Sequence, residues 1–509
     1  MKRIALAVSL LLVPAAVAIA AEKDPAPAKV SVKVRKVTHP MEVCKLEEGR
    51  LYPQRASNEE LKPIRRKLKE REAEIRAGVE KAKPVQAAQA TQAYKDWKAL
   101  PKEKRYGREG DELKAVYTEF NAVVRDVIQK DVHWNRLKEQ FRNTRDKHCR
   151  TIEATEPIVT LHNGLIEVKI APTLGMRVVN AVDLKTGLSF TGTSDPRAYE
   201  KAPWRDIIAW TAGYQELSFP YFEHGVGVRQ SAGFRVIERD DGSVTVAMNM
   251  RFTSHQHPRH QARYGRYSQR HASVWVTLKP GEGRYTATYR IDNPNPLPRS
   301  DRAWTNVLME ADRYDGKHII YPAGYIMPHN GGWVKPFYAQ GGERSWQSVS
   351  HFALYPEYEF CGVYSPRTDN NCLIIRPADT APGMKLYTPN ASGGFLELWV
   401  GSTTLFEYPG ELLSGYVPIQ YELTFYNAKG IGRVKFANRH VAIGGDDVRA
   451  VLLSPAAGKA KVLDEAGKVL GEGPVGPHTT LTVPRRDDMT VQIDGQTVAR
   501  VHLPLKFKD

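Results

Sequence analysis

The segment Val168–Gly187, with the sequence VKIAPTLGMRVVNAVDLKTG, carries the clearest structural pattern of the chain. Its first residues alternate in polarity as a half-buried strand does, and they run into the turn-forming residues Pro172–Gly175. A second apolar strand follows, and Asp183–Gly187 closes it with residues that favour a hairpin turn. The segment therefore predicts two antiparallel strands joined by a short connection.

Strand patterns of the same kind fill the region around this segment. From Glu153 to about Asn438 the sequence alternates short apolar or aromatic runs with Gly, Pro and Asn turns. The clearest strands are expected at residues 233–250, 272–277, 285–291 and 394–400. Because no helical pattern intervenes and the region is too long for a small immunoglobulin-like unit, we expect one large two-sheet domain over residues 151–438.

The N-terminus has the three parts of a secretory signal peptide. Lys2 and Arg3 form a basic start, Ile4–Val17 is an apolar run, and Ala18–Ala20 is a small-residue cleavage site. The apolar run is shorter than the ~20 residues that a membrane-spanning helix needs. We therefore expect a signal peptide over residues 1–20, export to the periplasm or the cell exterior, and no membrane span after cleavage.

Two further regions precede the β-rich part. Residues 21–57 are rich in Pro and Lys and contain one alternating run, which predicts a linker and an edge strand. Residues 58–150 are rich in Glu, Lys, Arg and Ala, with apolar residues at helical spacing. They predict helices interrupted at Pro84 and Pro101, the longest over Asp111–Arg145.

The C-terminal residues 439–509 predict a small accessory β-domain. Short strands recur there, residues 461–470 have a hairpin pattern, and the tail has few aromatic residues and no evident acid–base cluster. The fold class is therefore mainly β, with a helical N-terminal segment, a large antiparallel sandwich and a small C-terminal β-domain.

Four cysteines are present, and in an exported chain this number indicates two disulfides. The nearest pairing joins Cys44 to Cys149 around the helical region and Cys361 to Cys372 around a turn. Two other pairings stay open. No Cys-x-x-Cys spacing occurs, so no metal site is expected.

The chain carries a formal net charge of +16. An exported protein meets few nucleic acids, so we expect no nucleic-acid partner and consider anionic glycans or an anionic envelope surface as counterparts. A basic surface that only maintains solubility is the alternative. Because a Gly-x-Ser-x-Gly elbow, a phosphate loop, a dinucleotide fingerprint and a His-Glu-x-x-His motif are all missing, we expect no cofactor.

The order of these motifs resembles the galactose mutarotase-like, or aldose 1-epimerase-like, superfamily. There an early strand enters a large antiparallel supersandwich through a Pro-x-Leu-Gly-x-Arg turn, as Pro172–Arg177 would here. Residues 210–224, WTAGYQELSFPYFEH, resemble a loop of a bacterial domain-of-unknown-function family in this superfamily, often found before tetratricopeptide repeats. The resemblance covers about residues 155–435 and implies a supersandwich with sugar ligands, although fold alone does not fix function.

Four residues are candidates for acid–base catalysis: Glu216, His224, His329 and Glu397. Glu216 falls on the family's Glu, in a Gly- and Pro-bounded segment that also holds His224. His329 precedes Gly-Gly in a predicted loop, and histidine is the usual proton carrier near neutral pH. Glu397 matches by order the late-chain Glu base of aldose epimerases. A structural carboxylate at Glu216 and a plain surface residue at His329 are the alternatives.

Residues for holding the sugar are expected in three segments. Trp304, Asn306 and Glu310 belong to the predicted strand AWTNVLME, where the indole would stack on a sugar and the amide would bond hydroxyl groups. Core packing of Trp304 is the alternative. The second segment is the loop of His329, where Trp333 is the candidate.

The third segment, residues 254–267, has the sequence SHQHPRHQARYGRY. Its candidates for contact with carboxylate or sulfate groups are Arg259, Arg263, Tyr264 and Arg266. Metal binding is disfavoured because no carboxylate stands among its histidines. A solvated basic hairpin tip is the alternative.

The sequence thus predicts an exported carbohydrate-active protein that acts on a poly- or oligosaccharide, with anionic glycans among the options. Glycoside cleavage needs an acid and a base or nucleophile, which Glu216 and Glu397 fit. Epimerisation or lysis needs proton shuttles, which His224 and His329 fit. We favour cleavage, and a non-catalytic glycan-binding or envelope-associated protein is the alternative class.

Overall fold

The computed structural model describes residues 29–44, 58–101, 108–145, 149–173, 175–191, 204–205, 214–218, 233–251, 271–292, 299–300, 304–310, 318–320, 325–328, 350–354, 359–376, 383–387, 395–401, 412–413 and 418–503. The expected signal peptide, residues 1–20, lies outside the described residues. Among the helices that the structure describes, none combines the length and apolar character that a bilayer crossing requires.

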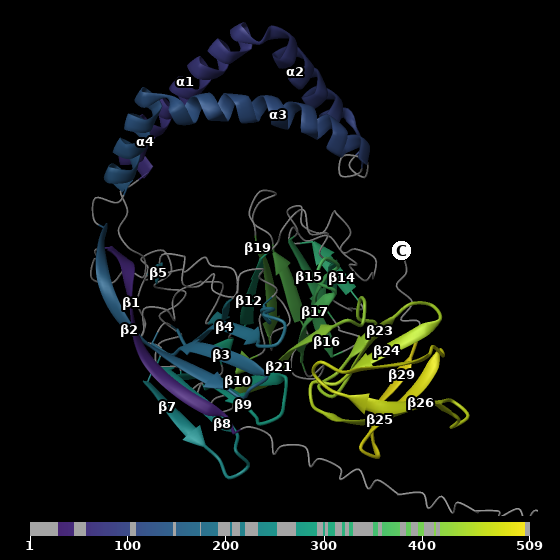
Figure 1. Ribbon diagram of the computed structural model, residues 1–509. Helices are drawn as coiled ribbons and strands as arrows, with labels where there is room; N and C mark the ends of the chain where they lie inside the picture. Colours follow the sequence, from purple (N-terminus) through teal and green to yellow (C-terminus); the bar gives the residue numbers. More distant parts are fainter. Residues whose placement is uncertain are drawn as a thin grey trace, which may run out of the picture.

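Four helices form the N-terminal region. They are α1 (Asn58–Ala82), α2 (Pro84–Ala99), α3 (Arg108–Lys130) and α4 (Val132–Arg145). They pack on one another around apolar side chains that include Ile75 and Phe120. Figure 1 shows them as an arch above the sheets, joined to them through β1 (Ser31–Cys44) and β2 (Cys149–His162).

The prediction of a single helix over Asp111–Arg145 is wrong, because the helix is interrupted at Asp131, between α3 and α4. The Oδ1 of Asp131 accepts a hydrogen bond from the Trp134 backbone N–H at 2.6 Å, so Asp131 caps α4. Its Oδ2 lies 2.7 Å from the guanidinium of Arg71 on α1. The hydrogen bond from Arg71 is the main reason why the pKa of Asp131 falls to about 2. This carboxylate therefore both starts α4 and holds it against α1.

Eleven strands form the larger sheet, in the spatial order β14-β15-β18-β19-β12-β6-β4-β3-β2-β1-β5. All neighbours are antiparallel except β1 and β5. The strands not yet given are β3 (Ile166–Ala171), β4 (Arg177–Asp183), β5 (Trp204–Arg205), β6 (Tyr214–Ser218), β12 (Trp304–Glu310), β14 (Tyr325–Pro328), β15 (Ser350–Leu354), β18 (Gly383–Tyr387) and β19 (Phe395–Gly401).

The segment Val168–Gly187 folds as its pattern predicts. Strands β3 and β4 pair antiparallel with an irregularity between Lys169 and Ile170. The turn after β4 is closed by Asp183, whose Oδ1 accepts a hydrogen bond from the Thr186 N–H at 2.8 Å. This pair of strands lies near the middle of the larger sheet.

Eight strands form the smaller sheet, in the order β13-β16-β17-β21-β10-β9-β8-β7. They are β7 (Gly233–Glu238), β8 (Val244–Arg251), β9 (His271–Leu278), β10 (Arg284–Asp292), β13 (His318–Ile320), β16 (Phe360–Ser365), β17 (Asn370–Ile375) and β21 (Ile419–Lys429). A short separate pair joins β11 (Arg299–Ser300) to β20 (Leu412–Leu413). Alternate residues such as Val168, Val246 and Leu423 are fully buried between the two large sheets, which confirms the predicted sandwich.

The C-terminal part forms two four-stranded sheets. One contains β22 (Phe436–Ala437), β23 (Ala442–Gly445), β24 (Arg449–Leu453) and β27 (Thr480–Pro484). The other contains β25 (Gly458–Asp464), β26 (Val469–Val475), β28 (Asp488–Ile493) and β29 (Gln496–His502). The predicted hairpin over 461–470 is confirmed, because β25 and β26 pair antiparallel.

Polar contacts fix this C-terminal domain to the sandwich, beside which it lies in Figure 1. The Nε2 of His478 lies 2.7 Å from the Oδ2 of Asp183, and both side chains are largely buried. The Gly283 N–H donates to the Pro455 carbonyl at 2.6 Å. The hydrophobic core also continues from the sandwich into this domain.

The cysteines of the β16–β17 hairpin correct one prediction. Cys361 and Cys372 lie in the expected hairpin but are two reduced thiols, not a disulfide. The register pairs Cys361 with Ile374 and Cys372 with Val363, so the two cysteines are diagonal neighbours. Diagonal positions are ~7–8 Å apart, whereas a disulfide needs Cβ atoms ~3.5–4.5 Å apart.

Cys44 and Cys149 are direct register partners across β1 and β2. Opposite positions of antiparallel strands have Cα atoms ~4.5–5.5 Å apart, which is within the range for a disulfide. The Cys44–Cys149 disulfide stays a prediction, and this register supports it.

Candidate functional site

Three neighbouring strands of the larger sheet carry most of the described residues that the sequence singles out. The register of β6, β12 and β19 places Asn306 opposite Glu216 on one side and opposite Trp399 on the other. Directly opposite residues of antiparallel strands share a face of the sheet. Glu216, Asn306 and Trp399 therefore occupy one row on one face.

The residues next to this row show which face it is. Gln215 donates from Nε2 to the hydroxyl of Tyr285 in the smaller sheet. The hydroxyls of Thr305 and Tyr421, again one from each sheet, lie 3.2 Å apart. Since these side chains point into the sandwich and strand residues alternate between faces, the row lies on the outer face, the face of the larger sheet turned away from the smaller sheet.

The other predicted residues of these strands occupy the outer face as well. Glu397 is opposite Leu308, and Glu310 is opposite Phe395, so Glu310 and Glu397 are diagonal neighbours on adjacent strands. Such positions are ~7–8 Å apart. Five predicted residues therefore share this face: Glu216, Trp304, Asn306, Glu310 and Glu397.

Strand β18 extends the outer face with two positions that the sequence analysis did not assign. Lys385 is opposite Trp399, and Tyr387 is opposite Glu397. The face is therefore lined by positions of acidic, basic, amide and aromatic residues. The alternate positions of the same strands, such as Leu396 and Leu398, are apolar and belong to the sandwich face.

Arg177 is a further residue that the sequence analysis did not assign to the site. Val178 of β4 pairs with Gln215 of β6, so the next positions along the two strands, Arg177 and Glu216, are neighbours on the outer face. The side chain of Arg177 is only 1% exposed. A buried guanidinium beside a carboxylate position favours an ionised carboxylate. The only sequence signal for this residue was a charged side chain at the start of a mostly apolar strand.

Asn306 is the central residue of the row and is fully buried. Neither its Oδ1 nor its Nδ2 has a hydrogen-bond partner within the part of the chain that the structure describes. Most buried polar groups do have partners, because an unmet buried donor or acceptor costs about 1–3 kcal/mol. Asn306 therefore places two unmet hydrogen-bonding atoms beneath the outer face.

Aromatic pairs across β10 and β21 of the smaller sheet lie beneath the row. Tyr285 stacks on Phe425 with ring centroids 5.0 Å apart, and Tyr289 stacks on Tyr421 at 5.1 Å. Burial raises the pKa of Tyr285 and of Tyr421 above the usual range, so their hydroxyls keep their protons. The floor of the site is therefore held by protonated hydroxyls and stacked rings.

The remaining predicted residues lie outside the described residues. They are His224, Arg259, Arg263, Tyr264, Arg266, His329 and Trp333. Within the described ranges, no cluster of three His, Cys, Asp or Glu side chains is arranged to hold a metal ion.

A two-sheet antiparallel sandwich with a polar outer face, an N-terminal helical region and a C-terminal β-domain defines the class of this protein. The chain belongs to the family described as "Domain of unknown function (DUF5107)", whose model matches residues 140–399. This confirms the predicted family of unknown function. A search of curated proteins gives no match.

Several solved structures are similar to the chain. A TPR-domain-containing protein from Parabacteroides distasonis has a TM-score of 0.44 and 14% identity over 55% of this chain and 48% of its own, so the match spans about half of that protein. A galactose mutarotase-like protein from Clostridium acetobutylicum has a TM-score of 0.40 and 9% identity over 54% of this chain and 96% of its own. A galactose mutarotase-like protein from Lactobacillus casei has a TM-score of 0.38 and 12% identity over 53% of this chain and 100% of its own. Mutarotase-like proteins are thus among the structural neighbours, as the sequence predicts.

Proposed function

We propose that the outer face of the larger sheet binds a poly- or oligosaccharide and cleaves its glycosidic bonds. The observation that carries this proposal is the register, which collects three glutamate positions, two tryptophan positions and the buried residues Arg177 and Asn306 on one face. The Asn306 amide has no partner among the described residues. Sugars present both hydroxyl groups and apolar ring faces, which match amides and indoles. The signal-peptide pattern of residues 1–20 supports action outside the cytoplasm.

The two catalytic roles follow from the neighbours of each glutamate position. Arg177 adjoins Glu216 and favours its ionised form, so we assign Glu216 the role of base or nucleophile. Glu397 lies between Leu308 and Tyr387, with Glu310 and Lys385 at diagonal positions, and we assign it the role of general acid.

The register also gives an approximate separation of these two positions. Glu216 and Glu397 are two strands and one same-face step apart, which corresponds to ~12 Å between Cα atoms at ~4.8 Å per strand and ~6.8 Å per two residues. Glutamate side chains on Cα atoms at this separation are long enough to bring their carboxyl groups within the ~5–9.5 Å that glycoside hydrolysis uses.

The test is to incubate the mature protein with neutral, uronate-bearing and sulfated polysaccharides and to measure new reducing ends and unsaturated products. We expect new reducing ends from the wild type. Glu216→Gln should lower the rate by ~100-fold or more, because that change removes the proton chemistry. Glu238→Gln, at an exposed position of β7 in the other sheet, is the matched control. Folded Glu216→Gln protein with full activity would contradict the assignment, and unsaturated products would indicate a lyase.

A non-catalytic glycan-binding protein is the second candidate, and one observation favours it. Trp399 is opposite Asn306, and Trp304 is two residues from Asn306 on the same face, so the two tryptophans are diagonal neighbours. Adjacent indoles suit the flat faces of successive sugar rings. Binding of a polysaccharide without any product, in wild type and Glu216→Gln alike, would select this function.

A further inference from the structure

Helices α1 and α4 pack against each other, next to the ends of β1 and β2 in Figure 1. The guanidinium of Arg65 lies over the Phe141 ring at 5.6 Å, and the Nε1 of Trp134 donates to the Oε1 of Glu72 at 3.3 Å. The later residue of α1 meets the earlier residue of α4, so the two helices are antiparallel. Since residues seven apart lie on the same side of a helix, these two contacts mark one side of the helix pair.

Two rows of three basic residues lie on this side. Their spacing of three, four and seven residues places each row on one stripe of its helix. The row on α1 consists of Lys62, Arg65 and Lys69, and the row on α4 consists of Lys138, Arg142 and Arg145. Trp134 and Phe141 are partly exposed rings between the rows, and the Lys138 ammonium lies 4.5 Å from the centroid of the Trp134 ring. We call these eight residues the basic face.

The basic face has an excess of positive charge. Its six cations are accompanied by Glu72, which accepts from Trp134, and at its edge by Glu59, which lies 4.0 Å from the Nζ of Lys62. The side chains of Lys62 and Glu59 are 78% and 83% exposed, so this pair is hydrated and weak.

The opposite side of the same helix pair has no such excess. Its cations stand beside at least as many carboxylates, and Arg71 is bonded to two of them. The cations are Lys67, Arg71 and Arg136, and the acids are Glu60, Glu74, Asp131 and Glu139. The positive excess therefore belongs to one face and not to the helices as a whole.

The dimensions of the basic face suit an extended polyanion. Each row covers seven residues, or ~10 Å at ~1.5 Å per residue, and packed helix axes are ~8–10 Å apart. A small anion would contact only one or two of the six cations. A chain of anionic groups that runs between the rows would contact both.

The two aromatic rings indicate which polyanion fits. Sugar rings have apolar faces that stack on aromatic side chains, and their carboxylate or sulfate groups pair with Arg and Lys. A helix that binds a lipid surface instead inserts apolar side chains beyond its charges. Here Lys138 and Arg65 lie over Trp134 and Phe141, so the rings are not placed for insertion.

We propose that the basic face of α1 and α4 binds an acidic polysaccharide. Its carboxylate or sulfate groups pair with the two rows of cations, and its sugar rings lie over Trp134 and Phe141. The signal-peptide pattern of residues 1–20 favours a glycan over a nucleic acid as the polyanion. This inference does not rest on the reaction proposed for the outer face.

The test is a binding titration of the full mature protein with labelled polygalacturonate and labelled heparin. Dextran, single-stranded DNA and phosphatidylglycerol vesicles are the comparison ligands. One variant combines Lys62→Gln, Lys69→Gln and Arg142→Gln on the basic face. The matched control removes the same charge from exposed positions elsewhere on α1 and α4, through Lys67→Gln, Lys81→Gln and Arg136→Gln.

Wild type should bind both acidic polysaccharides and not dextran. The basic-face variant should weaken this binding by about tenfold or more and reduce its salt dependence, because fewer counterions are released. The control should bind within about twofold of wild type, since its charges lie outside the face and are screened by salt. All six altered residues are exposed and glutamine favours helices, so circular dichroism should show unchanged helix content in both variants.

Three outcomes would overturn the proposal. Wild type could bind neither acidic polysaccharide, or the two variants could lose affinity equally, which would mean that only net charge matters. Tighter binding of single-stranded DNA or of the vesicles than of both polysaccharides would assign the basic face to a different partner.

Discussion

Replacement of Asn306 with leucine should stabilise the protein. Leucine has the same branching at Cγ but removes the two buried amide atoms that lack partners within the described residues. Each unmet atom costs about 1–3 kcal/mol, while the extra volume of leucine costs about 1–3 kcal/mol in a packed site. The expected net gain in unfolding free energy is about 1–2 kcal/mol, or ~2–8 °C in Tm at ~2–4 °C per kcal/mol.

Asn371 provides a matched control with the opposite expected sign. It is also fully buried, but its Nδ2 donates to the Ala428 and Gly432 carbonyls at 3.0 and 2.8 Å, and its Oδ1 accepts the Val434 N–H at 2.9 Å. Asn371→Leu leaves three backbone groups unsatisfied and should cost about 3 kcal/mol or more.

Urea unfolding and thermal melts of the two variants test this reasoning. Asn306→Leu should unfold at a higher temperature than wild type and lose glycan binding, while Asn371→Leu should unfold at a lower temperature. If Asn306→Leu is destabilised as much as Asn371→Leu, the Asn306 amide is satisfied by the fold and does not await a ligand.

Three further predictions concern the core, the thiols and the helical region. Tyr285→Phe should lower the unfolding free energy by about 1–3 kcal/mol, because it removes the hydroxyl that accepts from Gln215, and unchanged urea unfolding would contradict this. Cys361 and Cys372 should react with a thiol reagent only after denaturation, because both are buried and burial raises the pKa of Cys361 to about 11. A disulfide-linked pair of peptides in mass mapping without reduction would refute this. The pKa of Asp131 falls from 3.8 to about 2, so the stability that this carboxylate contributes is present above pH ~4 and lost as the pH falls toward 2. Asp131→Asn should therefore flatten the acid dependence of the helical circular dichroism signal over that interval. An unchanged pH profile would show that Asp131 is not the source of the acid dependence.

Local patterns predicted several of the strands. The prediction of a loop over residues 210–224 is wrong at Tyr214–Ser218, which forms β6. In the sequence Phe395–Gly401, Leu396 and Leu398 alternate with Glu397, which places the leucines on one face of a strand and the glutamate on the other. The strand predicted at residues 394–400 is observed as β19, Phe395–Gly401. Helix ends at Pro84 and near Pro101 were also readable, because proline restricts the backbone in known ways. The break at Asp131 was missed, since an aspartate becomes a cap only when the chain leaves the helix there, and its partner Arg71 lies on another helix.

Long-range register could not be read from the sequence. Nothing local in the segments around Glu216, Asn306 and Glu397 states that their strands are neighbours or which residues stand opposite each other. The same limit applies to Cys361 and Cys372, whose hairpin was predictable but whose offset by two residues was not.

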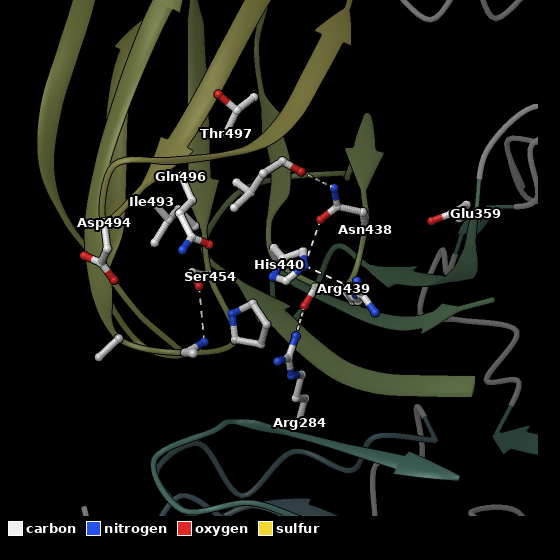
Figure 2. Close-up of a pocket in the computed structure, with 14 residues that line it drawn as sticks. Arg284, Glu359, Asn438, Arg439, His440, Ser454, Ile493, Asp494, Gln496 and Thr497 are labelled. Atoms are coloured by element: carbon white, nitrogen blue, oxygen red, sulfur yellow. Dashed lines mark hydrogen bonds between the residues drawn. The ribbon is translucent and has the colours of Figure 1, made fainter. Parts of the chain in front are cut away.

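A cavity of about 540 Å³ between the sandwich and the C-terminal domain (Figure 2) was hidden from sequence reasoning for a related reason. The tail showed no acid–base cluster because Arg439 and His440 are distant in sequence from Gln496, and Arg284 belongs to another domain. These residues come together only when the C-terminal domain packs on the sandwich.

A crystal structure with a bound oligosaccharide, chosen from the polysaccharide panel, tests the central claim most directly. We predict a sugar ring on the outer face, with a hydroxyl within hydrogen-bond distance of the Asn306 amide and a glycosidic oxygen between Glu216 and Glu397. A sugar bound elsewhere on the sandwich, with the outer face unoccupied and Asn306 satisfied by protein atoms, would contradict the account.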